Sequence, residues 1–295
     1  MKFKTLSIAL IAASIGTFAN AGAKQDVLVE KPVPQLKAQS ETNKYAKATV
    51  DYLSAVKKGD AQAKNDSLVI IQNDAGKILL ADYFMSQLYR TGTVEGKTQA
   101  DGLALLKKTA DAGVPEAQHD YGMVLYLGDS GVKKDQKKAL DYFTKAAEKG
   151  LGNSYHNICV YYEQGIAPIK KDLAKAQTCF KNAADKYHVT QSYGKYSAMK
   201  LADPKLDKAG EQEALKYAVL GGNKGDVASI ALAGTIMLTA KHNTPNLVGG
   251  FKNIQASAEM GYKPAYKVLG DLYTNGVGVA KDKEIGAIWL NRAAK

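Results

Sequence analysis

The sequence predicts an all-α protein built from a repeated pair of helices, and three observations support this fold class. Residues 117–150 contain two apolar runs with helical spacing, separated by a turn with Gly128 and Gly131. A short helix pair of this kind cannot bury both apolar faces alone, so it needs neighbours of the same kind. A helix-closing position recurs along the chain every 36 to 38 residues. The residue expected before each second helix is also of a type that favours a helix start.

Three series of positions define the repeat. Glycine occupies five of the six closing positions, and it is the residue that most easily ends a helix in a left-handed conformation. The closing positions are Gly76, Gly113, Gly150, Tyr187, Gly225 and Gly261. The small residues that open the first helices are Ala81, Ala117, Ser154, Ser192, Ala228 and Ala265. The expected N-cap residues of the second helices are Thr98, Asp135, Asp172, Gly210, Asn246 and Asp282.

The first 21 residues have the features of a secretory signal peptide. Lys2 and Lys4 precede an apolar stretch, and Ala19 to Ala21 fits the small-x-small cleavage rule. We therefore expect cleavage near Ala21 and a periplasmic or secreted bacterial protein. No later stretch approaches the ~20 apolar residues that a membrane-spanning helix needs, so no stable membrane insertion is expected.

Residues 22–44 contain Pro32 and Pro34 without a sustained helical period, which predicts an N-terminal arm or linker. In the fifth and sixth repeats, Leu201 to Lys208 and Ala240 to Leu247 replace the glycine-rich turn, so we expect helix pairs with different turns there. The expected repeat region is 45–295, divided at about 45–76, 77–113, 114–150, 151–187, 188–225, 226–261 and 262–295.

The last repeat carries the pattern that is most informative about the family. Residues 276–282 read Gly-Val-Gly-Val-x-x-Asp, preceded by Leu269-Gly270-x-x-Tyr273 and followed by Ala293-Ala294. This pattern resembles the Sel-one-like repeat, a relative of the tetratricopeptide repeat. The resemblance is clear in 114–150, 151–187 and 262–295, fair in 77–113 and weak in 188–261. It implies a right-handed α/α superhelical solenoid of about six to seven helix pairs, whose concave face binds peptides or proteins.

The positions that line the groove of the tetratricopeptide fold can be transferred to the first helices by analogy. They select aromatic, methionine, arginine and histidine side chains, which are enriched at protein interfaces. The predicted partner-binding groove consists of Tyr83, Gln87, Arg90, Glu116, His119, Met123, Tyr126, Asn153, His156, Glu163, Lys267 and Asp271.

Two features of this groove leave alternatives open. His119 and His156 occupy the same repeat position, so they form either a pH-sensitive or metal-assisted contact or simply two partly exposed surface residues. Tyr126 either faces a ligand or packs against the next repeat. The sequence predicts no metal site.

Cys159 and Cys179 are the only two cysteines. In an exported protein an isolated pair is more often a disulfide than a metal site. Two sulfurs without a histidine at ligand spacing also make a poor zinc site. The pair is therefore predicted to form a disulfide, with two buried free thiols as the alternative.

The formal net charge is +11, of which two charges belong to the predicted signal peptide. A positive chain can contact an anionic cell-wall polymer. However, the lysines are scattered along the sequence, which is typical of solvated helix faces.

Catalytic motifs are not found in the sequence. It has no His-Glu-x-x-His helix, no Gly-x-Ser-x-Gly elbow and no Ser-x-x-Lys set in a strand–helix context. We therefore expect a non-enzymatic scaffold for a peptide or protein partner of the cell envelope, in cell-wall or secretion machinery. No cofactor and no nucleic-acid partner are expected. The alternatives are a cell-wall-related or β-lactam-interacting enzyme, and a secreted virulence factor that binds host proteins.

Overall fold

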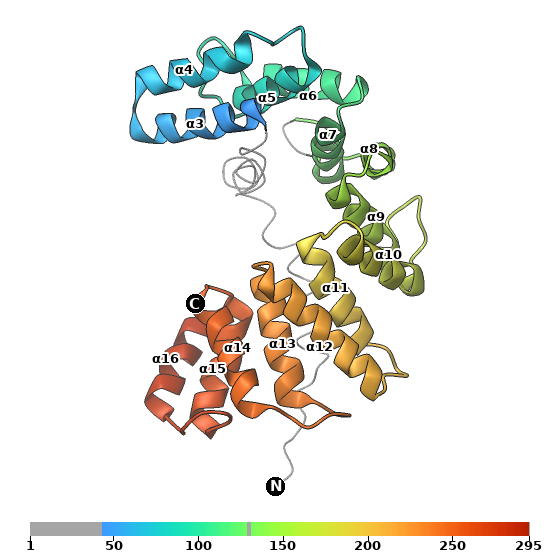
Figure 1. The fold of residues 1–295 in the computed structure, drawn as a ribbon, viewed down its shortest axis with the longest axis vertical. Coiled ribbons are helices and arrows are strands. Elements are labelled where there is room, and N and C mark those ends of the chain that lie inside the picture. The colour runs from blue at the N-terminus through green and yellow to red at the C-terminus, as the bar shows by residue number, and fades with distance from the viewer. Residues whose placement is uncertain (1–42, 129–130, 295) are drawn as a thin grey trace. The chain divides into compact units, whose positions relative to one another are not determined.

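A computed structural model describes residues 43–128 and 131–294, which form fourteen α-helices and no strand (Figure 1). The all-α solenoid class is therefore confirmed. The predicted signal peptide, 1–21, and all but the last two residues of the predicted arm, 22–44, lie outside the described residues. The chain divides into two compact units, whose described parts are 43–171 and 172–294. We call them the N-terminal unit and the C-terminal unit.

The N-terminal unit is a succession of packed helices. α3 packs on α4, α5 on α6 and α7 on α8, while α6 contacts α7 and α8 contacts α9. Its core is continuous, and Tyr52, Phe84, Leu106 and Phe143 are almost wholly buried in it. The helices are α3 (Lys44–Lys58), α4 (Ala61–Gln72), α5 (Leu79–Arg90), α6 (Gln99–Asp111), α7 (Pro115–Leu127), α8 (Gln136–Glu148) and α9 (Gly152–Gln164).

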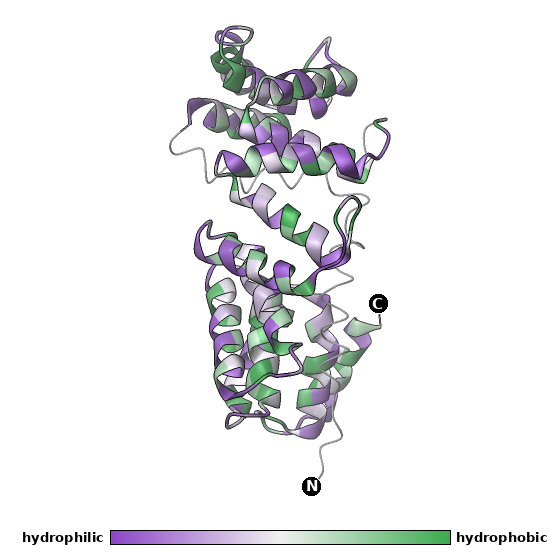
Figure 2. Ribbon diagram, turned by 90° about the vertical axis from the view of Figure 1, so that its right-hand side faces the viewer, coloured by the Kyte–Doolittle hydropathy of each residue, from purple (hydrophilic) through white to green (hydrophobic). Residues whose placement is uncertain are grey.

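The C-terminal unit follows the same rule, with each helix packed on the next from α10 to α16. Its core includes a hydrophobic cluster around Leu232 and Ile236 and another around Ile254 and Leu269. Figure 2 shows hydrophobic and hydrophilic residues alternating along the helices, as in helices that pack against neighbours on one side. The helices are α10 (Leu173–Asp185), α11 (Thr190–Leu201), α12 (Lys208–Asn223), α13 (Val227–Thr239), α14 (Leu247–Glu259), α15 (Lys263–Asn275) and α16 (Lys283–Ala293).

Second helices begin where their capping residues predict, with one exception. The side chains of Thr98, Asp135, Asp172, Asn246 and Asp282 each accept a hydrogen bond from a backbone N–H in the first turn. The prediction for Gly210 was wrong. α12 begins one turn earlier, because Asp207 caps it by accepting the N–H of Gly210 at 2.7 Å.

The closing glycines adopt the predicted left-handed conformation, with φ between 79° and 95° at Gly76, Gly113, Gly150, Gly225 and Gly261. In the remaining repeat the left-handed residue is His188, with φ 53°, rather than Tyr187. The repeat 226–261 is shifted in the same way at its opening position, since Ser229 is fully buried and Ala228 only partly. In both places the sequence spacing was right to within one residue.

Small residues let the two helices of a pair approach closely. A Cβ on Gly250 would lie 2.9 Å from the Gly234 carbonyl oxygen, and one on Gly286 would lie 3.0 Å from that of Gly270. These contacts bring α13 against α14 and α15 against α16. The equivalent first-helix positions in the other repeats are also small, namely Ser86, Gly122, Cys159 and Ser197. This explains why a small-residue pattern recurs with the helix period.

The turn that replaces the glycine-rich sequence in 240–246 is held by the preceding repeat. Glu211, which is 4% exposed, lies in the first turn of α12. Its carboxylate accepts the backbone N–H groups of Lys241 at 2.7 Å and His242 at 3.1 Å, and the Asn243 side chain at 2.8 Å. The buried carboxylate therefore fixes the conformation of this turn, whereas glycines allow the conformation of the other turns.

Candidate partner-binding ridge on the first helices

Four side chains of α5 and α7 form a hydrogen-bonded row that we call the polar ridge: Tyr83, Gln87, Arg90 and Asp120. The Tyr83 hydroxyl donates to Oδ2 of Asp120 at 2.9 Å, and the Gln87 amide donates to the same oxygen at 2.8 Å. The Gln87 carbonyl oxygen in turn accepts from Arg90 at 3.4 Å. Three of the predicted groove residues are thus brought together, and a carboxylate of the next repeat connects them.

The electrostatics keep Tyr83 a hydrogen-bond donor. Burial raises the pKa of Tyr83 well above its ordinary value, and the nearby carboxylates of Asp120 and Glu116 raise it further. The phenol therefore stays protonated at physiological pH. Because Asp120 accepts two hydrogen bonds, the ridge is ordered before any ligand arrives.

The ridge continues from α7 to α9 through His119. Nδ1 of His119 is hydrogen-bonded to the Ser154 hydroxyl at 2.9 Å, and its ring lies 5.7 Å from that of Phe143. Burial lowers the pKa of His119, although the Asp120 carboxylate opposes this shift. His119 is therefore a packed, neutral residue at physiological pH. His156 occupies the equivalent position on α9 and is half-buried.

Met123 and Tyr126 also contact the following repeat. The Asn157 side chain donates to the Met123 sulfur at 3.3 Å. The Tyr126 ring lies 5.9 Å from that of Tyr161, and the Lys134 ammonium lies 5.9 Å from the Tyr126 ring. This geometry favours the packing interpretation of Tyr126.

The sequence did not identify the hydrogen-bond partners of Tyr83, His119 and Met123. These partners are Asp120, Ser154 and Asn157. Asp120 and Asn157 stand three residues after the opening residues of α7 and α9. A polar residue at this position in two consecutive repeats is the signal that could have found them. It was overlooked because the transferred offsets describe residues facing a ligand, whereas these residues connect adjacent helices.

The remaining predicted residues are more dispersed. Glu116, Asn153 and Glu163 are half-buried on α7 and α9. In the C-terminal unit, Lys267 and Asp271 form an ion pair at 2.9 Å within α15, spaced by one helical turn.

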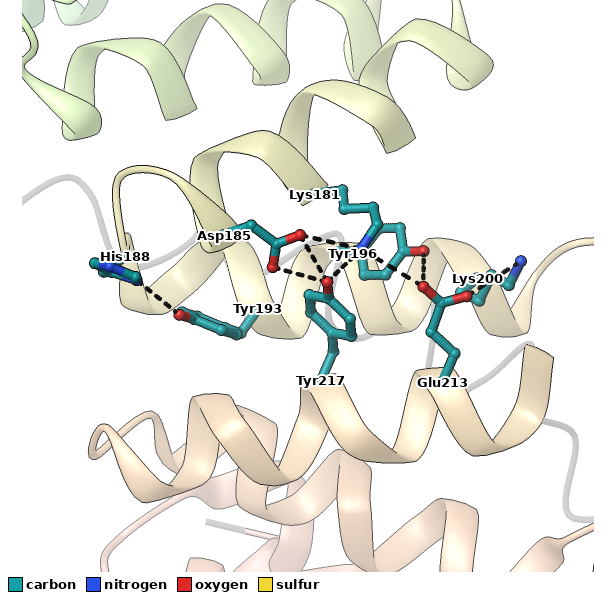
Figure 3. A network of polar contacts seen from close by, with 8 residues as sticks. All are labelled: Lys181, Asp185, His188, Tyr193, Tyr196, Lys200, Glu213 and Tyr217. Atoms are coloured by element: carbon teal, nitrogen blue, oxygen red, sulfur yellow. Dashed lines mark hydrogen bonds and ion pairs between the residues drawn. The ribbon is translucent and has the colours of Figure 1, made fainter. Parts of the chain in front are cut away.

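The C-terminal unit contains a second polar network, formed by α10, α11 and α12 (Figure 3). Tyr217 donates to Asp185 at 2.7 Å, and Lys181 donates to Tyr217 and lies 3.0 Å from Asp185. Burial works against the charge of Lys181, but its bonds to Tyr217 and Asp185 raise its pKa overall. The Lys181 ammonium also lies 5.1 Å from the ring centre of Tyr196, which donates to Glu213 at 2.8 Å.

The same arrangement occurs in the N-terminal unit, where Tyr142 of α8 donates to Asp111 of α6, and Asp111 pairs with Lys107. In both units, an aspartate on one second helix pairs with a lysine one turn earlier and accepts a hydrogen bond from a tyrosine of the next second helix. Because this network recurs in two repeats at equivalent positions, we interpret it as a structural connection between successive helix pairs rather than as an active site.

Both cysteines, Cys159 on α9 and Cys179 on α10, are disulfide-bonded. This confirms the predicted bridge and rules out the alternative of free thiols. Cys179 takes the second-helix position that Tyr142 and Tyr217 hold in the two lysine–aspartate–tyrosine networks.

The described residues contain neither a cluster of metal-ligand side chains nor a helix suited to cross a membrane. No group of three or more histidine, cysteine, aspartate or glutamate residues among them is arranged to hold a metal ion. In the same part of the chain, no helix combines the length and the apolar character required to span a bilayer.

The Sel1 repeat family matches residues 115–151, 152–188 and 264–295. The chain therefore contains three Sel1 repeats. These segments coincide, within two residues, with the three repeats in which the sequence resemblance is clearest. No curated protein matches the chain.

Solved Sel1-repeat structures share the fold. A Sel1 repeat protein from Oxalobacter formigenes is 22% identical, with a TM-score of 0.66, and the alignment covers 89% of this chain and 98% of that one. A protective antigen of uropathogenic Escherichia coli that displays the Sel1-like repeat fold is 21% identical, with a TM-score of 0.71. That alignment covers 98% of this chain and 61% of the antigen. Likeness at these identities establishes the fold alone.

Proposed function

We propose that this Sel1-repeat protein is a non-enzymatic scaffold of the bacterial envelope, periplasmic or secreted, that binds a protein or peptide partner along α5, α7 and α9. Sel1-repeat proteins are generally protein–protein interaction scaffolds. The disulfide is compatible with an exported protein, because such bonds persist in oxidising compartments. The observation that carries the proposal is the polar ridge, in which Tyr83, Gln87 and Arg90 are ordered around Asp120.

The ridge has the properties of a pre-organised binding surface. Its side chains are already fixed by hydrogen bonds, so less side-chain entropy is lost when a partner binds. Tyrosine and arginine are also the residue types that most often dominate binding energy. Within the described residues, neither Glu116 nor the second carboxylate oxygen of Asp120 forms a hydrogen bond or ion pair. Both can accept donors from a partner.

Site-specific photo-crosslinking in cells that produce the full chain tests the proposal. A photoreactive amino acid is placed at Glu116 or at Asn153, on α7 and α9. Matched control positions are Asp141 and Thr144, which are exposed on the second helix α8. We expect the two first-helix positions to trap the same envelope protein and the two α8 positions to trap none. Equal crosslinking from both helices would contradict the assignment.

The ridge variants Gln87→Ala and Arg90→Ala should then weaken binding of the trapped partner by about tenfold each, the usual scale of an interface anchor. Asp141→Ala is the control, because its exposed ion pair with Lys145 contributes little to stability. Unchanged affinity in folded ridge variants would show that the partner binds elsewhere.

A further inference from the structure

Six lysines of the N-terminal unit lie in two turns of adjacent repeats. Four lie in residues 131–138, from the α7–α8 turn into the start of α8, and two follow α9. All six are exposed. We call this set the lysine edge, and it consists of Lys133, Lys134, Lys137, Lys138, Lys170 and Lys171.

The two turns of the lysine edge belong to adjacent repeats that touch each other. The Tyr161 hydroxyl on α9 donates to the backbone carbonyl of Gln136, the first residue of α8, at 2.8 Å. Ile166 and Ile169 of the second turn pack against the core of the N-terminal unit. Lys133 and Lys134 therefore stand one repeat away from Lys170 and Lys171.

The glycine that ends the helix before each turn lies against a lysine in the same way. Gly128 and Gly165 close their helices with φ of 73° and 71°. A Cβ added to Gly128 would lie 2.9 Å from the Cβ of Lys134, and one added to Gly165 would lie 2.8 Å from the Cβ of Lys171. In the first turn, the Asp135 N–H also donates to the Leu125 carbonyl at 2.8 Å. Lys134 and Lys171 thus occupy equivalent positions in two adjacent repeats.

Most of this charge is not neutralised. Lys138 pairs with Asp135 at 3.3 Å. Among the described residues, Lys133, Lys137, Lys170 and Lys171 form no ion pair. Lys137 and Lys138 also lie in the first turn of α8, where the helix dipole disfavours positive charge. Stability therefore does not account for the lysine edge, whereas an anionic ligand would.

We propose that the lysine edge binds a linear anionic polysaccharide, a surface separate from the protein-binding ridge. A chain of regularly spaced anionic groups matches charges that recur from one repeat to the next. A bilayer surface fits less well, because no large hydrophobic side chain is strongly exposed in residues 131–171 to insert into it. A nucleic acid fits less well too, because the Tyr126 ring lies against Tyr161 and beneath Lys134 rather than open to stack on bases.

The test compares binding of the full chain to fluorescently labelled dextran sulfate with binding to single-stranded DNA and to vesicles of anionic phospholipid. The test variant carries Lys133→Gln, Lys134→Gln, Lys170→Gln and Lys171→Gln. The control carries the same change in charge on lysines outside the edge, Lys64→Gln, Lys77→Gln, Lys145→Gln and Lys149→Gln. Circular dichroism establishes that both are folded.

We expect wild type to bind dextran sulfate more tightly than DNA or vesicles, and its affinity for dextran sulfate to fall as the NaCl concentration rises. The test variant should bind at least about tenfold more weakly, and the control should stay within about twofold of wild type. Each two-lysine half of the test variant should show part of the loss, because both turns contact one polymer. Equal weakening in control and test variants, or stronger binding to DNA or to vesicles than to dextran sulfate, would overturn the proposal.

Discussion

At the scale of single residues, Gly278 connects two repeats of the C-terminal unit. It lies in the turn between α15 and α16, with φ 71°, and its Cα faces the backbone of Leu247 at the start of α14. A Cβ there would overlap the Leu247 carbonyl and lie 2.9 Å from the Cβ of Phe251. The chain therefore needs glycine at 278 for two reasons, the backbone conformation and the space.

Alanine substitutions at Gly278 and, as a control, at Gly261 distinguish the effect of the backbone conformation from the effect of the limited space. Gly261 has φ 89°, but nothing lies within 4 Å of a Cβ added to it. Gly261→Ala should lower the free energy of unfolding by roughly 1–2 kcal/mol, the cost of a left-handed non-glycine residue. Gly278→Ala should cost about 1–3 kcal/mol more, because backbone atoms must move. Urea titration of both variants checks this, and equal losses would mean that the contact with Leu247 is not tight.

Residues whose role depends on their own neighbours in sequence could be predicted. Asp135 and Asp282 were identified as N-caps because a cap is a local bond between a side chain and the first turn. Asp120 was missed because its two donors come from another repeat, 33 and 37 residues away. The cap of α12 was misplaced for a local reason, since Asp207 has a side-chain acceptor for the first turn and Gly210 has none.

At the scale of elements, helix pairs could be predicted because the hydrophobic period and the small residues describe packing within a pair. The irregular turns could not, because their support comes from elsewhere. The 240–246 turn has no glycine, and it holds its shape through Glu211 of the preceding pair. The candidate site was predicted in the same partial way. Tyr83, Gln87 and Arg90 do meet, but the contact that joins them to the next helix was not visible in the sequence.

Glu211 makes the stability of this element depend on pH. Burial alone would raise the pKa of Glu211, but the hydrogen bonds from Lys241, Asn243 and His242 lower it below its ordinary value near 4.5. A carboxyl whose pKa is lower in the folded state stabilises the fold above the unfolded pKa. This stabilisation is lost as the pH falls through the folded value.

Glu211→Ala should therefore lower the free energy of unfolding by about 2–4 kcal/mol at neutral pH, since it leaves buried N–H groups without an acceptor. Glu211→Gln should lose less, because it keeps one acceptor. Urea unfolding at neutral pH and at about pH 3 is the measurement, and the gap between wild type and Glu211→Gln should narrow at the lower pH. A gap that is the same at both values would show that the carboxylate charge does not hold the turn.

At the scale of the whole molecule, the contacts within each unit run mainly from one helix to the next in sequence order, as in other repeat proteins. The stability of such a chain is approximately a sum of repeat and nearest-neighbour terms, so a local change need not spread to every repeat. This distinguishes a solenoid from a single-core domain, where loss of one contact lowers protection throughout.

Gly278→Ala provides the test at this scale, because its effect begins at the contact between the last two helix pairs. Hydrogen exchange of the folded variant should be faster in α14, α15 and α16, by about tenfold or more for a local loss near 1.4 kcal/mol. Exchange in α3 to α6, in the N-terminal unit, should match wild type. Gly261→Ala lies at the end of α14 and should affect the same helices, but less strongly. Faster exchange in all fourteen helices of the described chain would mean that the repeats unfold as one cooperative body, and the sum of neighbouring terms would not describe this protein.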